Sequence, residues 1–224
     1  MLALRSSNTL LASGWTCTRR PNKRRCLSSI SSFAQPPYKI LFFGADNFSC
    51  VTLDTLYKTR KDLIQHLVVV TPPDQRTGRR SKEIHRPPLR HLAESLSIPS
   101  ISLPKTLLKD WLPPDEFLSS PSPSNLLITA SFGHLLPTSL LSRFLPLNAL
   151  NLHPSMLPKY RGAAPIQWSV INGDADCNWY DQEKGCGVTV QELSRGKFDR
   201  GRILGSEQIV SFQNLSLKLR TSKR

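Results

Sequence analysis

Four short, continuous apolar runs constrain the fold of this chain more than any other feature of its sequence. They lie at residues 39–44, 66–71, 125–130 and 147–152. Short runs that are apolar throughout, without alternation, are typical of strands buried on both faces of a parallel sheet. Two further runs, at residues 187–193 and 202–210, alternate between apolar and polar positions and predict two more strands.

Helical signals separate the first runs from one another. Asp46 or Asn47 can cap a helix that continues through Leu56, and residues 88–96 begin with a proline, which favours the first turn of a helix. Strands that alternate with helices build βαβ units, so we predict an α/β fold with a Rossmann-like, mostly parallel sheet and flanking helices. In such a sheet ligands bind beyond the carboxyl ends of the strands, and that is where functional residues are expected.

The composition fits a globular protein with one core. The chain has 224 residues, of which 39% are hydrophobic. No run of about 18 apolar residues occurs, so we predict no transmembrane helix and no membrane partner. Proline and serine dominate residues 112–124, which we expect to form a surface loop.

The N-terminal segment has a distinct composition. Residues 1–39 contain no Asp or Glu and seven Lys or Arg residues, half of the formal net charge of +14. A basic, serine-rich, acid-free start is typical of a mitochondrial transit peptide. We therefore expect residues 1–37 to be a transit peptide or disordered, and the protein to reach the mitochondrial matrix. A plastid address has a similar composition, and a basic tail that contacts RNA is the other alternative.

The cysteines predict neither a disulfide framework nor a metal site. Their number is odd, and no CxxC pair or histidine at metal spacing accompanies them. The five residues are Cys17, Cys26, Cys50, Cys177 and Cys186.

The segment from Asn151 to Gln167 carries the clearest chemical pattern. Asn151 and His153 are two residues apart at the end of an expected strand, so their side chains point to the same side. An amide and an imidazole that converge on one point can stabilise a carbonyl oxygen as it becomes negatively charged, as acyl transfer requires. Residues of these types at a strand end also serve in turns or as satisfied core residues, so the pattern alone leaves both roles open.

This segment resembles the signature of the 10-formyltetrahydrofolate-dependent formyltransferases, in which Asn-x-His is followed by Ser-x-Leu-Pro. Its continuation, Tyr160 to Gln167, is similar to the methionyl-tRNA formyltransferases in particular. Three supporting blocks agree with the family in order and spacing, at residues 40–48, 71–79 and 130–137. The resemblance covers about residues 39–210 and implies the formyltransferase fold.

The resemblance implies a catalytic group of three residues. The family has an aspartate in a Leu-Asp-x-Gly pattern, and Phe198-Asp-Arg-Gly201 fits it here. Asn151 and protonated His153 would stabilise the tetrahedral oxyanion, while Asp199 would favour the charged imidazole and help to move the proton. Without the family, Asp199 is an ordinary turn residue before glycine.

The same resemblance implies a formyl donor and its binding residues. The donor would be 10-formyltetrahydrofolate, a co-substrate, and no metal would be needed. We expect it to be held by Phe132, Gly133, His134, Leu135, Leu136, Ser155, Leu157 and Pro158.

Basic residues suggest the second substrate, which the resemblance identifies as initiator methionyl-tRNA. Residues 74–90 carry six Lys or Arg residues, Arg86 and Arg90 among them, against two acidic residues. Such a loop suits contacts with phosphate groups, although a solvated basic face is the simpler alternative. The expected tRNA contacts are Arg79, Arg80, Lys82, Lys159 and Arg161.

Three features depart from the family pattern. Residues 177–186 interrupt a stretch that the family crosses almost directly, either as a surface insertion or as an intron read as protein. Residues 211–224 do not resemble the family's continuation, and its small C-terminal β domain is missing. We therefore expect a catalytic domain at residues 38–212, a basic tail at 213–224, and a monomer.

Two other functions stay open at this stage. One is a different formyl-folate enzyme of the same fold, either a glycinamide ribonucleotide formyltransferase or a formyltetrahydrofolate hydrolase. Residues 160–167 and the basic loop argue against both. The other is a non-catalytic, truncated RNA-binding remnant.

Overall fold

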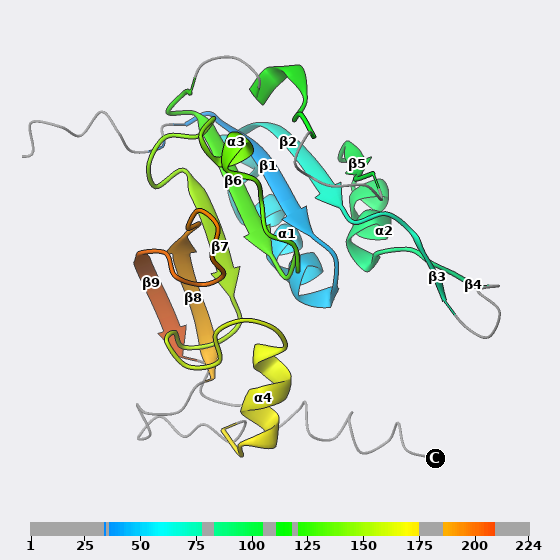
Figure 1. The fold of residues 1–224 in the computed structure, drawn as a ribbon. Coiled ribbons are helices and arrows are strands. Elements are labelled where there is room, and N and C mark those ends of the chain that lie inside the picture. Colours follow the sequence, from blue (N-terminus) through cyan, green and yellow to red (C-terminus); the bar gives the residue numbers. More distant parts are fainter. Residues whose placement is uncertain are drawn as a thin grey trace, which may run out of the picture. The chain divides into compact units, whose positions relative to one another are not determined.

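A computed structural model of the chain describes residues 34, 36–77, 83–104, 111–117, 121–174 and 186–208 (Figure 1). The expected transit peptide apart from residues 34, 36 and 37, the insertion up to residue 185 and the basic tail lie outside the described residues. Within the described part, no helix is long and apolar enough to cross a membrane.

The helices and strands follow the predicted alternation. In chain order they are β1 (Tyr38–Gly44), α1 (Asn47–Arg60), the 3-10 turn η2 (Lys61–Leu63), β2 (Ile64–Thr71), β3 (Gln75–Thr77), β4 (Glu83–His85), α2 (Pro88–Ser95), β5 (Ser100–Ser102), the 3-10 turn η5 (Asp115–Phe117), β6 (Asn125–Ala130), α3 (Thr138–Leu141), β7 (Ala149–His153), α4 (Pro165–Ile171), β8 (Gly187–Glu192) and β9 (Ile203–Gln208). Asp46 caps α1, because its carboxylate accepts a hydrogen bond from the backbone N–H of Ser49.

Seven of the strands form one sheet, and the other two form a hairpin. The sheet order is β5-β2-β1-β6-β7-β8-β9 (Figure 1). The first five strands in this order pair in parallel, whereas β8 pairs antiparallel with both of its neighbours, β7 and the edge strand β9. The prediction of a mostly parallel α/β sheet is therefore confirmed. The hairpin of β3 and β4 lies within the segment expected to be a basic loop.

Both faces of the central strands are buried, as continuous apolar runs require. On β1, Ile40 and Phe42 pack into a cluster with Leu53 of α1 and Leu89 of α2. The alternate residues of β1 pack on the opposite face, in a second cluster that contains Leu140 of α3. Helices therefore flank the sheet on two sides and hold the strand ends in place.

The expectation of a plain surface loop at residues 112–124 is wrong in part. The 3-10 turn η5 lies in this loop, and the side chain of Phe117 is fully buried in the second cluster. Its ring centroid lies 6.4 Å from that of Phe144. Proline and serine marked the surface character of the segment but could not show that its one aromatic residue turns inward.

Candidate active site

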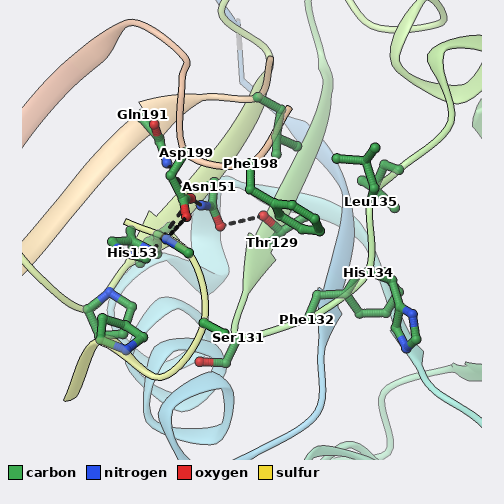
Figure 2. A pocket seen from close by; sticks show the side chains of 18 of the residues that line it. Thr129, Ser131, Phe132, His134, Leu135, Asn151, His153, Gln191, Phe198 and Asp199 are labelled. Atoms are coloured by element: carbon green, nitrogen blue, oxygen red, sulfur yellow. Dashed lines mark hydrogen bonds and ion pairs between the residues drawn. The ribbon is translucent and has the colours of Figure 1, made fainter. Parts of the chain in front are cut away.

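A cavity of about 550 Å³ lies at the carboxyl ends of β6 and β7, where the fold predicts a ligand site (Figure 2). Its walls come from Asp46 at the start of α1, the ends of β6 and β7, the loops after these two strands, the start of α4, and the segment from β8 into the turn before β9. The volume is in the range of small-molecule sites. In Figure 2 the side chains of Thr129, Asn151, His153, Gln191 and Asp199 gather on one side of this cavity.

Asn151 lies in the middle of a row of side chains that crosses three strands. It is the register partner of Thr129 on β6 and of Gln191 on β8. The Thr129 hydroxyl donates a hydrogen bond to Asn151 Oδ1 at 2.7 Å, and Asn151 Nδ2 donates to Asp199 Oδ1 at 3.0 Å. A carboxylate only accepts, so these bonds fix which end of the amide faces the aspartate.

His153 is buried at the end of β7, with 5% of its surface exposed. Its Nε2 lies 2.8 Å from the carbonyl oxygen of Tyr160, and its Nδ1 lies 3.5 Å from Asp199 Oδ1. A carbonyl oxygen only accepts, so Nε2 carries a hydrogen and Nδ1 is the nitrogen directed to the aspartate.

Asp199 reaches this group from the turn between β8 and β9. Its Oδ1 accepts from Asn151 Nδ2 and from Gln191 Nε2, and its Oδ2 accepts from the backbone N–H of Gly162 at 2.8 Å. Its backbone is left-handed, with φ at 48°. The three residues singled out from the sequence, 48 positions apart at the extremes, therefore share one site.

Glycine at position 201 lets this turn approach β8. A methyl group there would overlap the backbone carbonyl oxygen of Glu192. The backbone N–H of Glu192 also donates to the carbonyl oxygen of Arg202 at 2.8 Å. The Asp-x-Gly pattern thus has a local steric reason, independent of any family.

Comparison with known proteins identifies the family to which this chain belongs. A family model described as "Formyl transferase" matches residues 38–218. The chain belongs to the formyl transferase family. This confirms the family resemblance read from the sequence.

Curated formyl transferases from several organisms are similar to the chain. The mitochondrial methionyl-tRNA formyltransferase of Saccharomyces cerevisiae is 32% identical over 212 residues, which cover 86% of this chain and 50% of that protein. The methionyl-tRNA formyltransferase of Syntrophus aciditrophicus is 37% identical over 169 residues, which cover 75% and 48%. The chain thus spans about half the length of these relatives.

Solved structures agree on the fold. A phosphoribosylglycinamide formyltransferase from Brucella melitensis aligns with a TM-score of 0.52 over 82% of this chain and 86% of that one. The enzyme of that name from Bacillus halodurans aligns with a TM-score of 0.51 over 82% and 88%. Each is 17% identical, so they support the formyl transferase fold and nothing finer.

Five of the residues expected to hold the formyl donor line the cavity, and three do not. Residues 132–136 form the wall that lies across the cavity from Asp199 and His153 in Figure 2. Ser155, Leu157 and Pro158 are not among the lining residues.

The hydroxyl groups of Ser155 and Thr189 are instead used to shape the loop after β7. The Ser155 hydroxyl donates to the carbonyl oxygen of Lys159, and the Thr189 hydroxyl donates to that of Ser155. Thr189 also accepts from the backbone N–H of Leu157. The Ser-x-Leu-Pro pattern therefore has a structural reason in this formyl transferase: it folds the loop that presents Tyr160 to His153.

The expected tRNA contacts divide into two groups. Arg79, Arg80 and Lys82 lie outside the described residues. Lys159 and Arg161 are exposed on the loop after β7, where Lys159 Nζ lies 3.6 Å from Asp174 Oδ2 and Arg161 Nε donates to the backbone carbonyl oxygen of Asp199.

Two arginines that counted toward the basic loop serve the fold. Arg90 is 9% exposed and donates to the Thr71 hydroxyl, to Asp74 Oδ1 at 2.8 Å and to the carbonyl oxygen of Pro72. Arg86 contacts Glu94 and lies 3.9 Å from Asp74. Both arginines therefore fix the base of the β3–β4 hairpin.

Sequence reasoning missed Thr129 and Gln191. The signal for Gln191 was present, since Thr189 and Gln191 alternate with valines in β8, and both lie on its buried face. Polar residues on a buried face need partners. Their partners became visible only once the register placed Gln191 opposite Asn151.

Proposed function

We propose that this chain transfers a formyl group from 10-formyltetrahydrofolate to the amino group of methionyl-tRNA, for translation initiation in mitochondria. The observation that carries the proposal is the meeting of Asn151, His153 and Asp199 beside one cavity. The names of the curated relatives support the tRNA substrate, and the yeast relative is a mitochondrial protein. The basic composition of residues 1–37 supports the same address. We propose that the protein acts as a monomer.

The first step is attack of the methionyl amine on the formyl carbon. The amine nitrogen forms a bond to that carbon, and the formyl oxygen becomes negatively charged. Asn151 Nδ2 has two hydrogens, of which one is donated to Asp199 and the other remains for the oxyanion. A proton on Nδ1 of His153, beside Asp199, would make the imidazole cationic, and this positive charge would further stabilise the oxyanion.

The second step breaks the bond between the formyl carbon and the folate nitrogen. The amine loses one proton and the folate nitrogen gains one, so the reaction neither consumes nor releases protons overall. Asp199 is the carboxylate near this transfer, and it acts through His153 or through water. An α-amino group has a pKa of roughly 7.7–8.0, so a neutral amine is available without a strong base.

The donor would occupy the cavity between this group and residues 132–136. The backbone of Gly133 and its neighbours supplies hydrogen-bonding groups, and Leu135 and Phe198 offer exposed apolar surface next to them. An apolar wall with a few polar groups suits a flat, partly polar ring system such as a pterin. Lys159, Arg161 and the segment containing Arg79, Arg80 and Lys82 would contact the tRNA.

The test is a formylation assay on the purified chain with 10-formyltetrahydrofolate and charged initiator tRNA. We expect formyl-methionyl-tRNA from the wild type and a loss of at least about 100-fold in Asn151→Ala and His153→Ala. Release of free formate, or transfer only to glycinamide ribonucleotide, would assign the chain to another reaction of the same fold. Binding of tRNA without any turnover would indicate a non-catalytic RNA-binding remnant.

A further inference from the structure

Gln191 is a buried amide within the hydrogen-bonded group that holds Asp199. It lies on β8 directly opposite Asn151 and is 1% exposed (Figure 2). Its Nε2 donates to Asp199 Oδ1 at 2.8 Å, the same oxygen that accepts from Asn151 Nδ2 at 3.0 Å. One oxygen of the carboxylate thus accepts hydrogen bonds from two side-chain amides on adjacent strands.

The other end of the Gln191 amide has no hydrogen-bond partner. Among the described residues, Gln191 Oε1 is one of two buried side-chain polar atoms in this condition. A flip of the Gln191 amide would not give Oε1 a partner, because Oε1 would then face a carboxylate oxygen that has no hydrogen to donate. The bond from Nε2 to the Asp199 carboxylate is therefore the one polar contact of the Gln191 side chain among the described residues.

Asp199 needs to be held in place. It lies in a turn with a left-handed backbone, at φ 48°, a region that few residues other than glycine, asparagine and aspartate adopt. The groups that face its carboxylate are Asn151 and His153 from β7, Gln191 from β8, and the Gly162 N–H from the loop after β7. Hydrogen bonds to an ionised group are stronger than those between neutral groups.

We propose that Gln191 is a positioning residue: it fixes the rotation of the Asp199 carboxylate, so that Oδ1 stays beside His153 Nδ1 while Oδ2 is held by Gly162. The unpaired Oε1 is the consequence of that arrangement. The inference deepens the proposed function, since it assigns a role in the same formyl transfer.

Gln191→Met tests this role, because methionine has a similar size and length but no amide. We expect kcat for formyl transfer to fall about tenfold or more, with the KM for the formyl donor within about twofold of the wild type. Loss of the bond to the ionised Asp199 carboxylate should also lower the melting temperature, so kcat is measured on folded protein. A purely structural glutamine would lower the melting temperature and leave kcat within about twofold of the wild type.

Asn148 provides a matched control. It is also fully buried, and its Oδ1 is the other unpaired atom. Its Nδ2 donates to the backbone carbonyl oxygens of Pro123 and Asn125, and it is not among the residues that line the cavity. Asn148→Ala should therefore lower the melting temperature and leave kcat, measured on folded protein, within about twofold.

The outcomes separate this inference from the proposed function. A kcat of Gln191→Met within about twofold of the wild type would overturn the positioning role. If the wild type formylates a different amine, the same comparison is made on that reaction. If the wild type shows no turnover at all, the positioning role is overturned together with the proposed function, whereas an unchanged kcat in Gln191→Met overturns the positioning role alone.

Discussion

The Nε2 atom of His153 lies 2.8 Å from the backbone carbonyl oxygen of Tyr160, seven residues further along the chain. The Tyr160 hydroxyl in turn donates to Asp174 Oδ2 at 2.7 Å, beyond the end of α4. The loop after β7 is therefore tied to the histidine by its backbone and to the end of α4 by a side chain. The orientation of His153 depends on the path of this loop.

Tyr160→Phe separates these two connections, since it keeps the carbonyl and removes the hydroxyl. We expect a loss of about 1 kcal/mol in the free energy of unfolding, because Asp174 Oδ2 loses a donor. Turnover should stay within about threefold of the wild type, since the carbonyl still meets His153. Denaturant unfolding and the formylation assay measure the two quantities. A loss of activity much larger than the loss of stability would place the hydroxyl itself in the reaction.

Tyr160 also predicts how stability changes in alkali. Burial raises the pKa of Tyr160 above its ordinary value of about 10, and the Asp174 carboxylate adds to this rise, against the opposing effect of the hydrogen bond from Asn172. Below that value both states keep the proton, and the contribution to stability is constant. At a pH between the ordinary pKa and the raised pKa of the folded state, only the unfolded chain releases the proton. The free energy of unfolding therefore falls as pH rises through this interval.

The alkaline prediction is checked by comparing the wild type with Tyr160→Phe. Unfolding measured from about pH 9 to about pH 11 should show a steeper decline in the wild type. The difference between the two curves isolates Tyr160 from the other tyrosines and the lysines. Parallel curves over this interval would contradict the raised pKa.

Thr129→Val should weaken the reaction through Asn151. The variant keeps the shape of the side chain but leaves Asn151 Oδ1 without its 2.7 Å donor, so the amide is free to rotate away from Asp199. Loss of one such bond is worth about 1 kcal/mol, and we expect kcat to fall about fivefold. Thr129→Ser keeps the hydroxyl and is the control. Equal kcat values in the two variants would show that the hydroxyl does not orient the amide.

The sequence was a good guide to the fold where one signal decided each element. Buried parallel strands are apolar throughout, so β1, β2, β6 and β7 were predicted within a few residues of their observed bounds. The two-residue spacing of Asn151 and His153 also decided their common direction. The three-residue strand β5 and the strands of the β3–β4 hairpin were missed, because such short pairings carry no period of their own.

The contacts of the site residues were less predictable than the residues themselves. Gln191 needed the register between β7 and β8, which depends on the packing of both strands. Arg90 looked like a phosphate contact from charge alone, but it is buried beside Thr71 and Asp74. Ser155 carried the family pattern, yet its hydroxyl bonds the loop backbone. Charge and motif identify residues that matter without saying what they touch.

Gly201→Ala should disturb the turn that carries Asp199. A methyl group would overlap the carbonyl oxygen of Glu192, so the turn must move away from β8. We expect a loss of about 1–3 kcal/mol in the free energy of unfolding and a fall of about tenfold or more in kcat. Gly205→Ala on β9 is the matched control, because its methyl group meets no atom within 4 Å. Similar effects in both variants would mean that the space at Gly201 is unimportant.

Arg79→Ala tests the tRNA side of the proposal. Arg79 lies outside the described residues, between β3 and β4, and family resemblance makes it the strongest candidate for a phosphate contact. We expect tRNA affinity to fall about tenfold and the slope of log affinity against log salt to decrease by about 1, with binding of the formyl donor unchanged. Lys58→Ala removes an equal charge from α1, where Lys58 pairs with Asp54 at 2.8 Å, and should leave tRNA binding nearly unchanged. Equal weakening of tRNA and donor binding in Arg79→Ala would indicate a general loss of structure and would count against a direct contact.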